Sequence, residues 1–169
     1  MRLVAIDGGL IWLDFHVHKG QQVRAKYIAF DDDFVDIEEE DYNKIFHYAL
    51  PFGQNIPPRG IYIFHLKEEI YGISYYRHLD LETAENINMV AVVWLATRIF
   101  NPYILVPALK TIFKLGTTDI IPINEETLEK VVGSVVEHDG MVNCSINGNE
   151  VISELPPGNL DNYPVKFLL

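Results

Sequence analysis

The stretch that decides the fold is residues 61–79, which read IYIFHLKEEIYGISYYRHL. Two runs rich in aromatic and β-branched residues, 61–66 and 70–79, flank the charged triplet at 67–69. Such side chains favour strands, and a short polar break between two such runs is typical of a β-hairpin. We therefore predict two antiparallel strands joined by a tight turn.

The segments on either side of this hairpin extend the pattern. Residues 89–96, MVAVVWLA, are continuously apolar, which is typical of a strand buried on both faces. Near the N-terminus, residues 3–15 and 22–30 form another strand pair, with a bulge or turn expected at Gly8-Gly9. Because these strands follow one another as hairpins, the sequence predicts a central antiparallel sheet of about five strands.

Three segments have the spacing of amphipathic helices: residues 37–50, 102–115 and 124–138. Asn101 and Asn124 are suitable N-caps, Pro102 suits a first helical position, and Gly116 suits the end of the second helix. The predicted order is β-β-α-β-β-β-α-α, an α+β fold with helices packed on an antiparallel sheet.

A C-terminal extension follows from about residue 139. Residues 141–152 form an expected hairpin around Asn147-Gly148, a favoured two-residue turn. Residues 165–169, VKFLL, are too apolar to be left free. The chain shows no internal repeat and no second-domain boundary, so we predict a single domain over residues 1–169.

Composition and charge limit the classes of partner. The 169 residues carry a net charge of −11, which disfavours nucleic acids and anionic membrane surfaces and favours basic protein partners. The single cysteine, Cys144, forms no intramolecular disulfide, which indicates a reducing, cytoplasmic location. Charged residues and prolines interrupt the apolar stretch 89–115, so we expect no integral membrane segment. Asp7 and Gly8-Gly9 interrupt the N-terminal apolar run, so we expect no signal peptide.

The search for chemistry yields weak signals. His16 and His18 would share one face of a strand, but no third metal ligand is marked by its spacing. Residues 31–41 hold eight carboxylates without the EF-hand pattern, so a solvated loop is favoured over a calcium site or a basic-partner patch. Cys144 has only the remote His138 as a base. We predict no catalytic residue, no cofactor, no metal and no enzymatic activity.

Four segments, in order, resemble the N-terminal longin (upstream DENN) module of DENN-domain proteins, most closely the Avl-type late-secretory branch. They are WLDFHVHKGQQV at 12–23 with Tyr27 after it, ALPFG at 49–53, IFHL at 63–66 and IYGISYYR at 70–77. The apolar run 89–96 stands where the family has its fifth strand. The resemblance covers roughly residues 3–115, and YGISYYR is its most specific motif.

The resemblance implies a longin-like fold and a role as an interaction module of a regulator of Rab-like GTPases in membrane trafficking, part of a guanine-nucleotide exchange factor. In that family exchange needs a larger central domain as well, so we expect no exchange by this chain alone. The motif positions suggest Phe64, Tyr75 and Arg77 as partner-contacting residues. The alternative is a longin-type scaffold or adaptor that pairs with another longin or DENN subunit, without exchange activity. Either role implies a cytoplasmic protein, recruited to endomembranes only through partners.

Overall fold

The structure is a computed structural model that describes residues 4–5, 8–30, 36–50, 57–79, 86–96, 106–138, 141–146, 148–153 and 165–168. Its strands are β1 (Val4–Ala5), β2 (Gly8–His16), β3 (Gly20–Ala29), β4 (Arg59–Lys67), β5 (Ile70–His78), β6 (Ile87–Ala96), β7 (Val136–His138), β8 (Met141–Ile146), β9 (Asn149–Ser153) and β10 (Val165–Leu168). Its helices are α1 (Glu39–Ala49), α2 (Val106–Thr117) and α3 (Glu125–Ser134).

The main sheet has the strand order β10-β4-β5-β6-β2-β3. The five strands from β4 to β3 pair antiparallel, as predicted, and β10 adds to the β4 edge as a parallel strand. The apolar run 89–96 lies within the central strand β6, where burial on both faces explains its lack of polar residues. The predicted longin-like α+β fold is confirmed.

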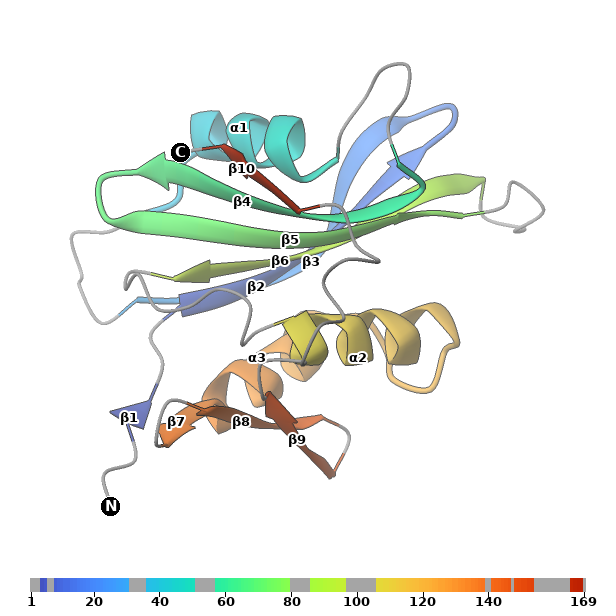
Figure 1. Ribbon diagram of the computed structural model, residues 1–169. Helices are drawn as coiled ribbons and strands as arrows, with labels where there is room; N and C mark the ends of the chain where they lie inside the picture. Colours follow the sequence, from blue (N-terminus) through green and yellow to red (C-terminus); the bar gives the residue numbers. More distant parts are fainter. Residues whose placement is uncertain are drawn as a thin grey trace.

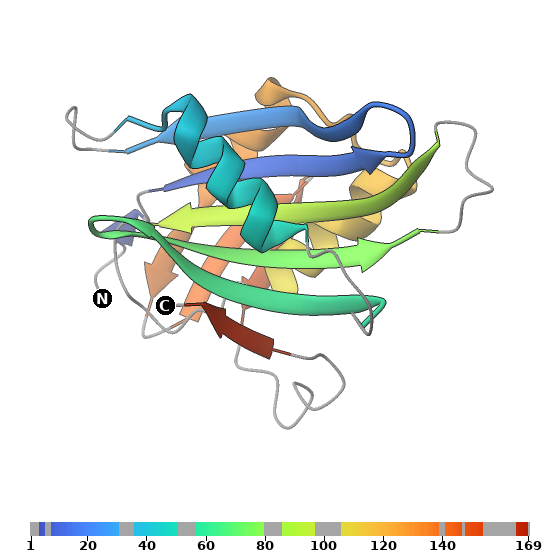
Figure 2. The same cartoon turned by 90° about the horizontal axis from the view of Figure 1, so that it is seen from above.

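The elements stack in four layers (Figure 1). Helix α1 lies alone on one face of the main sheet, and α2 and α3 lie on the other. Beyond α2 and α3 lies a second sheet with the order β1-β7-β8-β9, whose strands β8 and β9 contact these helices. Seen from above, α1 crosses the main sheet obliquely, and β10 lies beside β4 at its edge (Figure 2).

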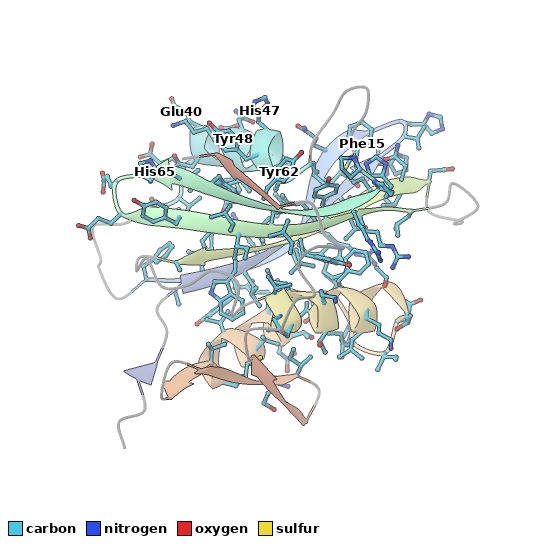
Figure 3. All side chains as sticks on the ribbon, viewed as in Figure 1. Phe15, Glu40, His47, Tyr48, Tyr62 and His65 are labelled. Carbon is cyan, nitrogen blue, oxygen red and sulfur yellow. The ribbon has the colours of Figure 1, made fainter. Side chains whose placement is uncertain are left out.

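The α1 face has a core formed by the odd-numbered residues of β2 together with inward residues of β4 to β6 and α1. Ile11, Leu13, Phe64 and Ile45 are fully buried in it. Eight further apolar residues pack against this core while remaining partly exposed: Phe15, Val23, Ile28, Phe30, Ile37, Tyr42, Phe46 and Tyr48. Figure 3 shows Tyr48 above the sheet near Tyr62, with Phe15 apart from them toward the β2–β3 hairpin.

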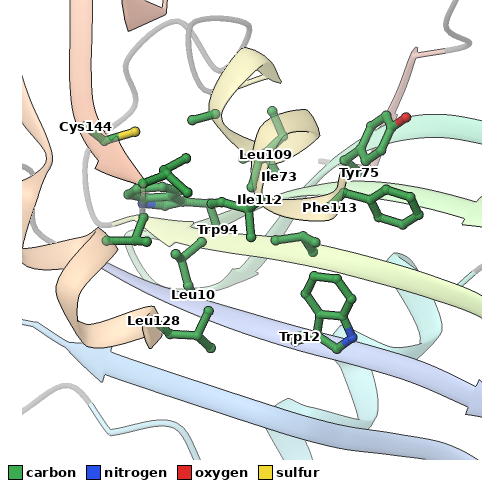
Figure 4. Close-up of a cluster of buried hydrophobic side chains, with 14 of the residues drawn as sticks. Leu10, Trp12, Ile73, Tyr75, Trp94, Leu109, Ile112, Phe113, Leu128 and Cys144 are labelled. Carbon is green, nitrogen blue, oxygen red and sulfur yellow. The ribbon is translucent and has the colours of Figure 1, made fainter. Parts of the chain in front are cut away.

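The α2/α3 face is covered more completely. Trp12 stacks on Phe113 of α2 with ring centroids 6.1 Å apart, and Tyr75 meets the same ring edge-on at 5.3 Å. Leu128 of α3 and Cys144 of β8 belong to the same cluster, so both the helices and the second sheet contribute to it (Figure 4). Among the residues that the structure describes, four partly buried apolar residues flank this core: Tyr27, Leu79, Leu115 and Ile123.

Two glycines of the β4–β5 hairpin make room for aromatic rings on the cross-strand partner. Gly60 pairs with Tyr76 and Gly72 pairs with Phe64. A Cβ on Gly72 would overlap the Phe64 ring, and one on Gly60 would lie 2.8 Å from the Tyr76 hydroxyl. An aromatic ring that covers a cross-strand glycine replaces the packing that the glycine cannot supply. The glycine of YGISYYR is therefore explained by packing within the sheet.

The last helix is shorter than predicted. Asn124 caps α3 by accepting a hydrogen bond from the Thr127 amide at 2.9 Å, as expected. The predicted end at His138 was wrong, because α3 ends at Ser134 and β7 begins at Val136. The Ser134 hydroxyl accepts from the Ser145 amide at 2.8 Å, which ties the helix end to β8. The β-branched residues that follow Ser134 then continue as a strand.

Other predicted details had mixed outcomes. The turn before β9 follows the prediction, since Ile146 pairs with Asn149 and Gly148 has a φ of +78°. Gly8 and Gly9 begin β2, and the irregularity in the β2–β3 ladder lies at Arg24 instead. Helix α2 contains Gly116 and ends one residue later. The predicted cap at Asn101-Pro102 lies outside the described residues.

Candidate functional site

A polar hollow lies where the β2–β3 hairpin meets the start of β6. It has a volume of about 440 Å³, within the usual range for ligand sites, and is open to solvent. We call it the hairpin hollow, and it is lined by Asp14, His16, Lys19, Gln22, Val23, Arg24 and Ile87. Most of these side chains can form hydrogen bonds. The hollow is therefore a candidate site for a polar ligand or for a polar group of a partner protein.

Strand register explains why polar residues gather here. Directly opposite residues of an antiparallel sheet share one face. One row runs across the sheet through five such residues: Gln22, Asp14, Val90, Arg77 and Arg59. Val90 belongs to the core on the α2/α3 side, so the row lies on that face. At this end of the sheet the apolar core gives way to polar side chains, and Asp14 is only 3% exposed.

His16 stabilises the turn between β2 and β3 by accepting backbone hydrogen bonds. Its Nδ1 atom accepts hydrogen bonds from the amides of His18 and Lys19, both at 3.0 Å. A ring nitrogen that accepts is unprotonated, so in the neutral ring the proton is on Nε2, which can donate to a ligand. The His16 and His18 rings lie 5.8 Å apart. Within the described residues no group of three metal-binding side chains forms, and the spacing of this pair is accounted for by the turn.

The hollow is rich in hydrogen-bond donors although the chain as a whole is acidic. Lys19 and Arg24 line it, and Arg77 and Arg59 continue the same face. The Trp12 indole N–H is buried and has no hydrogen-bond partner among the described residues. Trp12 does not line the hollow, so this N–H is not one of its donors. The cationic side chains of Lys19 and Arg24 suit a carboxylate or another anionic group, and the buried Asp14 carboxyl is the one acidic group in the lining.

The three residues suggested by the motifs do not lie together. Phe64 is fully buried against the α1 layer, and Tyr75, which is 4% exposed, packs against α2 on the opposite face. Phe64 and Tyr75 each pack in one of the two hydrophobic cores, so neither side chain is accessible to a partner in this conformation. Arg77 is exposed and stands in the same row as Asp14. Of the three, Arg77 alone is placed to meet a partner.

The acidic segment contributes a structural carboxylate. Asp41 accepts a hydrogen bond from the Glu38 amide at 2.9 Å and pairs with Lys67 of β4 at 2.6 Å. Burial alone would raise the pKa of Asp41. The hydrogen bonds from Lys67 and Glu38, with the charges of Lys67 and Lys44, outweigh burial and lower this pKa. Asp41 therefore anchors the start of α1 to the sheet, while residues 31–35 lie outside the described residues.

Cys144 is not an activated nucleophile. Its side chain is 2% exposed, and burial raises the pKa of the thiol to about 11. The thiolate is the reactive form of cysteine, and it is scarce at neutral pH when the pKa is so high. The side chain serves the packing between β8 and the helices.

Sequence reasoning missed Asp14, Gln22 and Arg24. A usable signal was present at Asp14, the single charged residue in the apolar run LIWLDF at 10–15. A charged residue at a core-facing position of a strand usually has a partner or a function. Arg24 carried no such signal, because it reaches the hollow through the irregular register between β2 and β3, which no local pattern predicts.

The α2 and α3 helices are short, and none of the described helices is long and apolar enough to span a membrane.

No protein-family model matches the chain, and no curated protein matches it.

Proposed function

We propose that this chain is the longin-type interaction module of a DENN-type regulator of small Rab-like GTPases, the non-autonomous part of a guanine-nucleotide exchange factor. The observation that carries the proposal is the placement of the family-like motifs. IFHL and YGISYYR form the adjacent strands β4 and β5 of the five-stranded sheet, and WLDFHVHKGQQV forms the β2–β3 hairpin. Three of the four motifs that resemble the family thus lie in one antiparallel sheet, whereas ALPFG begins at the end of α1 and continues outside the described residues.

The exposed polar residues of these motifs suggest the contact surface. Lys19 lines the hairpin hollow and Arg77 extends the same face, whereas most of the apolar motif residues are buried or partly buried. Val17, in the turn of the β2–β3 hairpin, is the exception and is 44% exposed. Exchange factors of this kind act by binding and opening the nucleotide site of the GTPase, so they need a complementary surface rather than a catalytic side chain. We propose the hairpin hollow and Arg77 as that surface. Arginine is prominent among residues that dominate protein interfaces.

The test is binding of the purified chain to a panel of nucleotide-free Rab GTPases, measured by biolayer interferometry beside a complete DENN protein as positive control. We expect at least one Rab to bind, and Arg77→Glu to weaken that binding about tenfold or more, the effect of losing about 1.4 kcal/mol. Lys130→Glu is the matched control. It reverses the charge of an exposed helical lysine on α3, with its side chain 75% exposed, and should leave the affinity unchanged.

If no Rab binds while the complete DENN protein binds, the proposal fails. Loss of binding with both variants would show that overall charge, and not Arg77, is responsible. In that case the contact surface would have to be sought elsewhere.

A second candidate role is that of a scaffold subunit that pairs with another longin or DENN protein. The β4 edge favours it, because β10 covers only the four residues Ile61–Phe64 of this nine-residue strand. Stable binding of a longin-type partner, with no Rab binding and no acceleration of nucleotide release when both subunits are present, would support this role over the first. In either role the chain would act in the cytoplasm and reach endomembranes through its partners.

A further inference from the structure

The two edges of the main sheet are built differently. At one edge, β3 carries an irregular register at Arg24 and the exposed residue Lys26. Bulges and charged side chains are known means by which edge strands avoid pairing with other chains. At the other end of the five antiparallel strands lies β4, which has the uncharged sequence IYIF over Ile61–Phe64. Such a stretch has high β propensity and would pair readily with another strand if it were open.

The β4 edge is covered by the chain itself. Strand β10 runs parallel to β4 with Val165 opposite Ile61 and Leu168 opposite Phe64. It is the only parallel pairing among the described strands. The pairing supplies backbone hydrogen-bond partners to the stretch of β4 that lacks charged residues. The cover is short, because β10 has only four residues.

The cover is also attached by a long connection. Residues 154–164, eleven in number, separate the end of β9 from the start of β10. Eleven residues span up to ~40 Å when extended, so the same length of chain could reach a neighbouring molecule. Identical subunits can exchange a terminal strand, because each strand finds in the other subunit the same pairing surface that its own chain offers.

We propose that β4 accepts the β10 strand of a second copy of this chain, so that two copies exchange their C-terminal strands. The second copy is the partner that fits, since its β10 has the sequence and register that β4 already pairs with. An eleven-residue tether gives the chain's own strand an effective concentration of order millimolar. The closed monomer therefore prevails at micromolar concentration, and exchange grows as the local concentration rises. This inference requires neither a GTPase nor a longin partner.

Disulfide trapping tests the exchange in the full chain. Tyr62 and Lys166 are directly opposite in the β4–β10 register. The first variant carries Tyr62→Cys and Lys166→Cys in a Cys144→Ala background, and we expect an intramolecular disulfide that confirms the register. The decisive sample mixes two single variants, Tyr62→Cys and Lys166→Cys, each in the same background. We expect a disulfide-linked heterodimer whose yield rises with protein concentration from micromolar to millimolar.

The matched control replaces Tyr62→Cys by Lys26→Cys, an exposed position on the opposite edge of the sheet. The Tyr62 and Lys166 pair should give at least tenfold more heterodimer than the Lys26 and Lys166 pair. Introducing Phe167→Pro into the Lys166→Cys chain should reduce the yield to the control level, because proline removes a backbone donor and disfavours a paired strand. Circular dichroism checks that each variant is folded.

Two results would overturn the inference. If the double variant forms no intramolecular disulfide, β10 does not pair with β4 in this register. If it forms one but the mixed single variants stay at the control level up to millimolar concentration, β10 is confined to its own chain.

Discussion

The two faces of the main sheet differ in how completely they are covered. On one face, α2, α3 and the second sheet enclose a core around Trp12, Trp94 and Phe113. On the other, α1 is the one described helix that packs on the sheet, and among the described residues eight apolar side chains remain partly exposed there, against four on the first face. The enclosed face is specialised for stability. The α1 face combines a buried centre with a margin of partly exposed apolar side chains. Truncating a side chain on this margin should lower the free energy of unfolding less, because water already reaches part of it.

The largest expected effect comes from truncation at the enclosed face. Trp12→Ala would leave a cavity between β2 and α2, since the Trp12 ring stacks on Phe113 and touches Gly116. We expect a loss of ~3–5 kcal/mol in the free energy of unfolding, measured by urea denaturation. Phe46→Ala on the margin of the α1 face should cost ~1–2 kcal/mol, because part of the Phe46 side chain is already exposed. Equal losses would contradict the distinction between the faces.

A smaller effect tests how tightly the buried centre of the α1 face is packed. Gly72→Ala would place a methyl group in the space of the Phe64 ring and should destabilise the protein by ~1–3 kcal/mol. Gly133→Ala is the matched control, because nothing lies within 4 Å of a Cβ at this exposed position in α3. The control should stabilise by ~0.5–1 kcal/mol.

Phe64→Leu provides the internal check, since a smaller side chain should tolerate alanine at position 72. In urea denaturation the double variant should be more stable than the sum of the two single effects predicts. Simple additivity would mean that the two positions are not in conflict, and the packing explanation would be wrong.

The smallest effect concerns the attachment of α1. Asp41→Asn removes the ion pair with Lys67 and should cost ~1 kcal/mol at pH 7. The pKa of Asp41 is lowered in the folded state. Its contribution is therefore present above the unfolded value, about 3.8, and is lost as the pH falls through the folded value. Urea denaturation between pH 7 and pH 2.5 should show the two proteins converging below about pH 4.

Glu126→Gln serves as the control, because Glu126 and Lys130 form an exposed pair on α3 with both side chains 75% exposed. Its effect should stay below ~0.5 kcal/mol. A constant difference between Asp41→Asn and the native protein at all pH values would show that the charge of Asp41 is not what holds α1.

Local signals in the sequence were sufficient for most of the fold. The aromatic and β-branched runs of 61–79, with the charged triplet between them, predicted the β4–β5 hairpin, and Asn124 predicted the start of α3. The end of α3 was missed because it depends on a hydrogen bond between Ser134 and Ser145, which is eleven residues away and lies on strand β8. Side-chain periodicity cannot carry information about a tertiary hydrogen bond of this kind.

The candidate site was predicted far less well. Motif position suggested Phe64 and Tyr75, but burial depends on which layer covers each face, and that is decided by the packing of distant helices. The hairpin hollow joins residues of β2, β3 and β6 through register, with a ladder irregularity at Arg24. Such a site becomes visible only when the strand order is known. Asp14 alone could have been singled out from its apolar surroundings in the sequence.

The pairing of β10 with β4 has a consequence during protein synthesis. Residues 8–96 contain all five antiparallel strands of the main sheet, whereas β10 lies at 165–168. Ribosomes add roughly 5–20 residues per second, so the last of the five strands precedes β10 by on the order of 4–15 s. During that interval the IYIF stretch of a nascent chain has no cover. Polysomes bring such chains close together, which makes this the period when unwanted association with a neighbouring nascent chain is most favoured.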